Sequence, residues 1–158
     1  MTAAANRAAS GRAPRPRHLG LTISASPGAV RDGLAQLRDF LSAARLGADV
    51  CGTAEIVLAE ALNNVAEHGY PSGKPGPIRI EAMLDETRLT VDITDEGTPL
   101  PGLRLPLGRS PLITRPKTEL PEGGFGWFMI HSLTSAISYR RRNGRNHLHL
   151  ALDVTGQE

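Results

Sequence analysis

The sequence predicts an α+β fold, a two-layer α/β sandwich in which helices cover one face of a mixed, mostly antiparallel sheet. Apolar residues recur at helical spacing in two long segments of the first half and in a shorter one near position 130. In several other short segments they alternate with polar residues, as in half-buried strands. The 158 residues, 40% of them hydrophobic, suffice for one domain with its own core.

The first 18 residues predict a disordered basic tail, so the folded domain is expected over residues 19–158. The tail is rich in alanine and proline and has no acidic residue, and such a composition buries too little apolar surface to fold. Its positive charge comes from Arg7, Arg12, Arg15 and Arg17. The domain then begins with a short, loosely alternating strand over 19–25.

Two amphipathic helices are expected next. The first starts near Pro27 and ends before Gly47, and the second runs from about 49 to 68, with Gly69 as its C-terminal stop. The apolar stripe of the first helix, at spacings of four, three and four, consists of Val30, Leu34, Leu37 and Leu41. The spacing predicts that these residues face the core.

Two hairpins and a third helix complete the expected order of elements. Strands over about 78–84 and 89–93 alternate and bend at Asp85-Glu86, and the final hairpin turns at Asn143-Gly144, a pair typical of a two-residue primed turn. A helix is predicted to begin after the glycines at 123–126. The segment before it is broken by Pro99, Pro101, Pro106, Pro111, Pro116 and Pro121. A loop of this length and proline content is usually disordered or a functional lid.

Polar residues interrupt this apolar pattern at three places. Glu60 and Asn64 lie four residues apart, on the flank of the buried face of the second helix. Asp95 and Gly97 follow the end of a strand. The glycines at 123–126 open a helix, whose free amides and dipole favour an anion. Each signal is weak alone, because solvated helix positions, turn aspartates and glycines before helices are all common.

In combination and order, these segments resemble the GHKL, or Bergerat-fold, ATPases. Residues 60–64 with 68–70 look like the family's N box, Asp95-Glu-Gly97 like its first glycine box, and Gly123–Gly126 like its second. The resemblance is to the stand-alone anti-sigma factor serine/threonine kinases, and it runs from about residue 19 through the final strand pair. Thr98-Pro99 is a departure, because the first glycine box often has a second glycine there.

The resemblance implies a role for each matched position. Asn64 would be an oxygen ligand of Mg²⁺, and Glu60 would be the general base that accepts a proton from the substrate hydroxyl. Asp95 would accept the exocyclic amine of adenine, and Gly97 would keep the backbone close to that base. The second glycine box would hold the phosphates of ATP as the lid closes, and its residues are Gly123, Gly124, Phe125 and Gly126.

The resemblance also implies a function. The chain would be an ATP- and Mg²⁺-dependent serine/threonine kinase and anti-sigma factor, which phosphorylates an anti-anti-sigma (antagonist) protein and sequesters a sigma factor. One alternative is an ATP-binding regulatory switch with little catalysis, against which the retained Glu60 argues. Another is a histidine-kinase catalytic domain acting in trans, but the chain has no room for the helices that bear a phosphoacceptor histidine. Family members are often dimers, although no pattern here predicts an interface.

Composition adds expectations about partners and location. No apolar run approaches membrane-spanning length, and the N-terminus lacks the apolar centre of a secretory signal. Cys51 is the single cysteine, which rules out an internal disulfide and fits a reducing cytoplasm. All 16 acidic residues lie beyond the basic tail, so the globule is not basic and direct nucleic-acid binding is not expected. His147 and His149 share a strand face, but no third metal ligand is evident.

Overall fold

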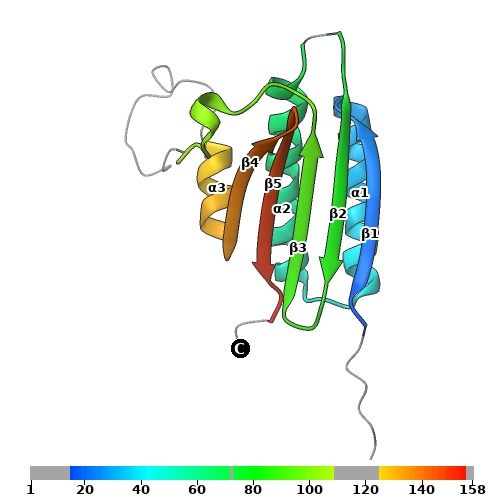
Figure 1. The fold of residues 1–158 in the computed structure, drawn as a ribbon. Helices are drawn as coiled ribbons and strands as arrows, with labels where there is room; N and C mark the ends of the chain where they lie inside the picture. Colours follow the sequence, from blue (N-terminus) through cyan, green and yellow to red (C-terminus); the bar gives the residue numbers. More distant parts are fainter. Residues whose placement is uncertain (1–14, 72, 109–124, 156–158) are drawn as a thin grey trace, which may run out of the picture.

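The computed structural model describes residues 15–71, 73–108 and 125–155, and there a sheet is covered on one face by helices (Figure 1). Its five strands have the order β1-β2-β3-β5-β4, and every neighbouring pair is antiparallel. The strands are β1 (Arg17–Ser24), β2 (Pro77–Leu84), β3 (Arg88–Asp95), β4 (Ala136–Arg142) and β5 (Arg145–Asp153). The predicted α+β sandwich is confirmed, and the expected mixed sheet is refined, because the described strands form no parallel pair.

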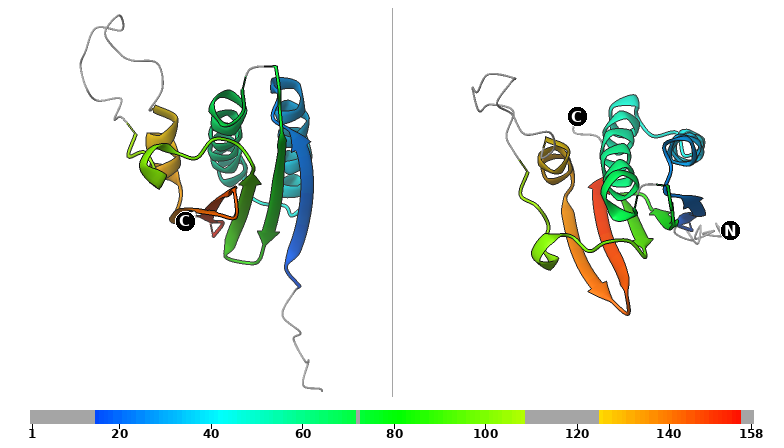
Figure 2. Two further views of the ribbon diagram at one scale, coloured as in Figure 1. Left: turned by 45° about the horizontal axis from the view of Figure 1, so that its top comes forward. Right: turned by 90° about the horizontal axis from the view of Figure 1, so that it is seen from above.

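The helices form the second layer, on the same side of the sheet (Figure 2). α1 (Pro27–Ala43) begins as the sequence predicts, with the Ser26 hydroxyl accepting a hydrogen bond from the Ala29 amide at 3.4 Å. α2 (Ala48–Asn64) packs between α1 and α3 (Phe125–Leu133). No helix in the described part of the chain is both long and apolar enough to cross a membrane.

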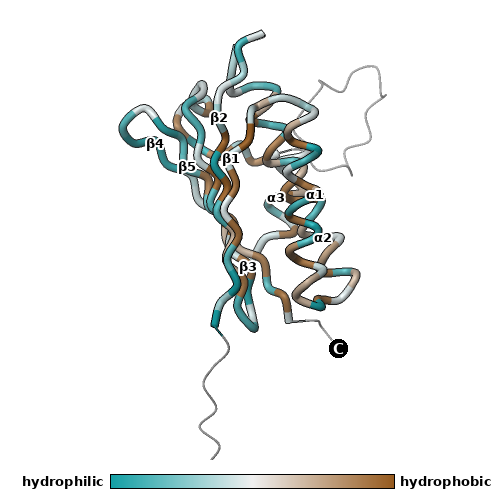
Figure 3. The backbone as a smooth tube through the Cα atoms, turned by 90° about the vertical axis from the view of Figure 1, so that its right-hand side faces the viewer, coloured by the Kyte–Doolittle hydropathy of each residue, from teal (hydrophilic) through white to brown (hydrophobic). Residues whose placement is uncertain are grey.

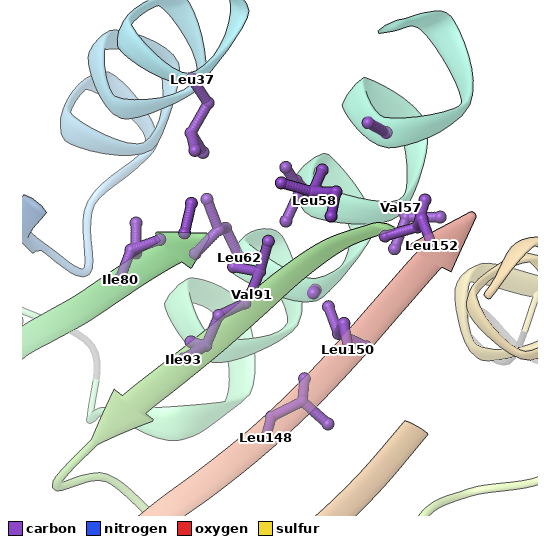
Figure 4. Close-up of a cluster of buried hydrophobic side chains, with 14 of the residues drawn as sticks. Leu37, Val57, Leu58, Leu62, Ile80, Val91, Ile93, Leu148, Leu150 and Leu152 are labelled. Carbon is purple, nitrogen blue, oxygen red and sulfur yellow. The ribbon is translucent and has the colours of Figure 1, made fainter. Parts of the chain in front are cut away.

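The core lies between the two layers, which Figure 3 shows edge-on. Every second residue of β2, β3 and β5 points at the helices and is buried. Each large aliphatic side chain removed from water here contributes roughly 1.5–3 kcal/mol. Figure 4 shows the centre of this core, where the buried side chains include Leu58, Leu62, Ile80, Val91, Ile93 and Leu150.

Two element boundaries differ from the sequence-based expectation. β1 begins at Arg17, two residues before the expected domain start, and the Arg17 guanidinium donates to the Ala43 carbonyl at 2.8 Å. The second helix continues to Gly69, as predicted, but its last turn, η1 (Val65–Gly69), is a π-helix. A π-turn closes i→i+5 hydrogen bonds in place of the i→i+4 bonds of an α-helix.

Candidate functional site

A cavity of about 360 Å³ opens where the end of α2, the end of β3 and the loop after β3 meet. Most of its walls are apolar, which suits a flat ring system. The apolar lining comes from five parts of the chain and includes Ala61, Val65, Leu100, Trp127 and Leu148. Two residues expected at a nucleotide, Asn64 and Asp95, also line it. The fold therefore brings two of the three polar places in the sequence to one cavity.

Asp95 is a buried carboxylate, with 6% of its surface exposed. Its Oδ1 accepts hydrogen bonds from the Gly97 amide at 2.9 Å and from Asn146 Nδ2 at 2.8 Å. A buried charge is tolerated when such donors replace water. Oδ2 takes no hydrogen bond from the described residues, so Asp95 can still accept one from a donor in the cavity.

Gly97 lies where the loop after β3 crosses the end of η1. The Thr98 amide donates to the Gly69 carbonyl at 2.5 Å. A Cβ on Gly97 would collide with that carbonyl oxygen and lie 3.0 Å from Asp95 Oδ1. Gly97 itself does not line the cavity. The close approach that requires glycine is therefore to the backbone of Gly69.

Asn64 is half-buried, whereas its neighbour Asn63 is exposed. Among the described residues, Asn64 Nδ2 is a buried polar atom with no hydrogen-bond partner, which costs roughly 1–3 kcal/mol if nothing compensates. The oxygen and nitrogen of an amide exchange places by a half-turn of the group, so this position can present either atom. A neutral amide oxygen fits Mg²⁺, which usually takes one or two protein ligands plus phosphate oxygens and water.

Glu60 lies one helical turn before Asn64 and is half-buried beside the start of α3. A Cβ on Gly126 would fall onto the Glu60 carboxylate, so any larger residue at 126 would displace that carboxylate from its present position. Gly126 precedes Trp127, which lines the cavity. Of the second glycine box, Phe125 and Gly126 begin α3, and Gly123 and Gly124 lie outside the described residues.

A hydrogen-bonded cluster on the final hairpin is not among the features predicted from the sequence. Asn146 is buried, with 5% of its surface exposed. Its Oδ1 accepts from the Tyr139 hydroxyl at 2.7 Å and from Arg141 Nη1 at 2.8 Å, and Arg141 Nη1 also donates to the Gly97 carbonyl at 2.9 Å. The cluster therefore joins β4, β5 and the loop beside Asp95.

The inward position of Asn146 did carry a sequence signal. Residues two apart on a strand share one face, and Asn146 is in phase with the buried leucines Leu148, Leu150 and Leu152. An amide in that row is a buried polar group that requires partners.

The loop that borders the cavity is held at several points. The Leu100 amide donates to the Tyr139 hydroxyl at 3.0 Å, and the His131 ring donates from Nε2 to the Pro106 carbonyl at 2.7 Å. Close to the start of this loop, the Tyr70 hydroxyl donates to the Pro77 carbonyl at 2.6 Å and accepts from the Glu96 amide at 2.8 Å. Burial of the phenol raises the pKa of Tyr70 above its usual range.

Two groups of histidines differ in their surroundings. His68 lines the cavity, but its side chain is largely exposed. His147 and His149 lie on the sheet face away from the helices, where His149 Nδ1 is 2.8 Å from Asp92 Oδ1 and His147 Nδ1 is 3.4 Å from the Thr94 hydroxyl. In the described ranges, no three His, Cys, Asp or Glu side chains form a metal-binding group.

Comparison with protein families places this cavity in a known context. The model of the histidine kinase-like ATPase domain matches residues 23–152, a range that includes every residue lining the cavity. Among solved structures, the RsbU and RsbW domains of a Mycobacterium tuberculosis protein superpose with a TM-score of 0.60 at 20% identity, covering 87% of this chain and 33% of that one. At this identity the superposition speaks for the fold alone.

Curated relatives give closer matches. The serine/threonine-protein kinase BtrW of Bordetella bronchiseptica is 30% identical over 133 residues, which cover 82% of this chain and 89% of BtrW. The serine-protein kinase RsbW of Halalkalibacterium halodurans is 32% identical over 57% of this chain and 55% of its own length. An anti-sigma F factor of Bacillus licheniformis is 33% identical over 52% of this chain and 54% of its own. The last two matches thus span about half of those relatives.

Proposed function

Because the chain belongs to the histidine kinase-like ATPase family, as the GHKL resemblance predicted, we propose that it is an ATP-dependent serine/threonine protein kinase. The observation that carries the proposal is the convergence of Asn64 and Asp95, from α2 and β3, on one mainly apolar cavity. Asn64 Nδ2 is a buried polar atom without a partner in the described part of the protein, and Asp95 Oδ2 takes no hydrogen bond from it. The name of the relative BtrW supports the same reaction class.

Asp95 and the apolar walls would select the base. Adenine presents an amino group where guanine presents a carbonyl oxygen. Asp95 Oδ2, as an acceptor in a buried setting, would bind the amine and repel the carbonyl, since a buried acceptor left unpaired costs free energy. The apolar lining would cover the faces of the ring.

Glu60, Asn64 and the second glycine box would serve the phosphoryl transfer. Mg²⁺, when bound, would neutralise charge on the phosphates, and the Asn64 amide oxygen is the group that would hold it. The Glu60 carboxylate would accept the proton of the attacking hydroxyl. Gly123, Gly124, Phe125 and Gly126 would bring backbone amides to the phosphate oxygens.

The partners follow from the names of the relatives. We propose that the phosphorylated substrate is an anti-anti-sigma protein and that the chain also binds a sigma factor, in the cytoplasm. The anti-sigma F factor and RsbW matches support this, although they span about half of those proteins. We also propose that the chain forms a homodimer and that it does not bind nucleic acid directly.

Phosphate transfer between purified proteins tests the proposal. The chain is mixed with γ-labelled ATP, Mg²⁺ and a candidate anti-anti-sigma protein, and acid-stable label on a serine or threonine is expected. Glu60→Gln should keep ATP binding and lose transfer by about 10²- to 10⁴-fold, because the base is removed and little else. Asn64→Ala should lose Mg²⁺-dependent transfer, whereas the matched change at the exposed neighbour, Asn63→Ala, should retain it.

The result also separates the alternatives. Full transfer by Asn64→Ala would refute the metal assignment. A complex that forms only with nucleotide, without label on either protein, would favour the regulatory switch over the kinase. Acid-labile label would indicate phosphohistidine and a histidine-kinase reaction.

A further inference from the structure

The two buried polar side chains of the described sheet residues lie against each other. Asp95, on β3, and Asn146, on β5, are 6% and 5% exposed, and they are paired across the two strands in the sheet register. Asn146 Nδ2 donates to Asp95 Oδ1 at 2.8 Å. Both side chains also line the cavity. Packing alone does not explain why a carboxylate and an amide are buried together there, because buried polar groups require hydrogen-bond partners.

The orientation of the Asn146 amide is fixed from its other end. Tyr139 and Arg141, on β4, both donate to Asn146 Oδ1, at 2.7 and 2.8 Å. Arg141 can only donate, and the other end of the amide faces three acceptors, so the oxygen must lie toward Arg141. The nitrogen is thereby directed to Asp95 and to the carbonyl oxygens of the loop after β3.

We propose that Asn146 is a positioning residue for the base-recognition carboxylate, held in orientation by Tyr139 and Arg141. By donating to Asp95 Oδ1, it stops the carboxylate from rotating and leaves Oδ2 as the acceptor for an exocyclic amine in the cavity. Asn146 thus determines purine selectivity through the free oxygen of Asp95, without itself touching the base. This inference rests on the proposed function, because it assigns a role within the same nucleotide site.

The same amide secures the loop that borders the cavity. Asn146 Nδ2 lies 3.2 Å from both the Gly97 and the Thr98 carbonyl oxygens. The Tyr139 hydroxyl that donates to Asn146 also accepts from the Leu100 amide at 3.0 Å. One cluster therefore sets both the carboxylate and the loop against which the base would lie.

The substitution Asn146→Asp tests the donor role directly. The new carboxyl can keep one oxygen against Tyr139 and Arg141, but its other oxygen faces only acceptors, namely Asp95 Oδ1 and two carbonyls. A proton must lie between the two carboxyls for this geometry to persist. ATP·Mg²⁺ affinity of the variant, measured by calorimetry, should approach wild type near about pH 5.5 and be at least about tenfold weaker near about pH 8.

Controls isolate this titration from others at the site. The charged or titratable groups around position 146 are Asp95 on β3, Tyr139 and Arg141 on β4 and, across the cavity, His68 on η1. Wild type and Asn63→Asp, the same change at an exposed amide, retain His68 and should show no comparable loss between the two pH values. A thermal melt at both pH values establishes that each variant is folded.

A second variant tests selectivity. Tyr139→Phe removes one donor to Asn146 Oδ1 and also the acceptor of the Leu100 amide, but it leaves Arg141 in place, so the amide is held less firmly. The ratio of ATP to GTP affinity should fall about threefold to tenfold. A purely structural cluster would leave this ratio unchanged.

The outcomes distinguish the two levels of the proposal. If wild type binds no adenine nucleotide, the proposed function fails. If wild type binds ATP but Asn146→Asp binds it equally at both pH values, the positioning role is overturned. If Asn146→Asp does not fold at the higher pH, the affinity ratio of Tyr139→Phe decides, and an unchanged ratio overturns the inference.

Discussion

At Gly97, two backbone segments come so close that a methyl group has no place between them. The obstruction is the Gly69 carbonyl oxygen, which already accepts the Thr98 amide. A flexible side chain could move away, but a hydrogen-bonded carbonyl at the end of a helix cannot do so without disturbing η1 and Asp95. The glycine of the first glycine box is therefore required by the scaffold that holds the carboxylate.

Gly97→Ala should lower the free energy of unfolding by about 1–3 kcal/mol, the usual cost of overpacking, and weaken ATP binding. Gly52→Ala is the matched control, because a Cβ at Gly52 meets nothing within 4 Å. Since Gly52 lies inside α2, the control should raise the free energy of unfolding by about 0.5–1 kcal/mol. Urea unfolding measures both, and an unchanged stability of Gly97→Ala would contradict the close contact.

Helices, strands and turns can be predicted where short sequence patterns determine them. The periodicity of four residues predicts the buried face of α1: Val30, Leu37 and Leu41 are buried, and Leu34 is half-buried against the core. The Asn143-Gly144 turn has the positive φ values, 52° and 73°, that a primed hairpin needs. The π-helical end of α2 could not be predicted. Its backbone can form either i→i+4 or i→i+5 hydrogen bonds, and no residue in 65–69 determines which of them form.

The turn between β2 and β3 gives a pH-dependent prediction. Hydrogen bonds from the amides of Thr87 and then Arg88 hold the pKa of Asp85 below its usual value. A depressed pKa means that the stabilisation is present above the unfolded pKa, about 3.9, and is lost as the pH falls through the folded value. Asp85→Ala should therefore be less stable than wild type at neutral pH, and the difference should shrink in acid.

Urea unfolding at about pH 7 and at about pH 3 measures this difference. Asp85→Asn is the control, since its amide oxygen can still accept from Thr87 and Arg88 without titrating. A gap between wild type and Asp85→Ala that stays constant with pH would show that the carboxylate charge is irrelevant to the turn.

At the scale of the whole molecule, the sequence predicts the two layers but not what they bring together. Asn64 and Asp95 were expected at one site through a family resemblance, and they line one cavity. Neither the strand order, with β5 between β3 and β4, nor the register that sets Asp95 opposite Asn146 follows from local pattern. The cluster of Tyr139, Arg141 and Asn146 depends on both, so only its inward-facing amide could have been anticipated.

Nucleotide should stabilise the folded chain as a whole. A ligand that binds only the native state adds about 2.7 kcal/mol at a hundred times its Kd, which raises Tm by roughly 5–10 °C for a domain of this size. Thermal melts with ATP·Mg²⁺ should show this increase in wild type and Glu60→Gln, and Asn64→Ala should lose the part that depends on Mg²⁺. An unchanged Tm of the wild type at millimolar ATP·Mg²⁺ would contradict nucleotide binding.

The bonds from Thr98, Leu100 and Pro106 to η1, β4 and α3 have an entropic consequence. A binding loop that must be ordered by its ligand subtracts the lost conformational freedom from the affinity. Here the part of the loop that borders the cavity is already fixed before any ligand arrives. A ligand that enters the cavity therefore does not have to order this part of the loop, and more of the free energy of its contacts remains as affinity.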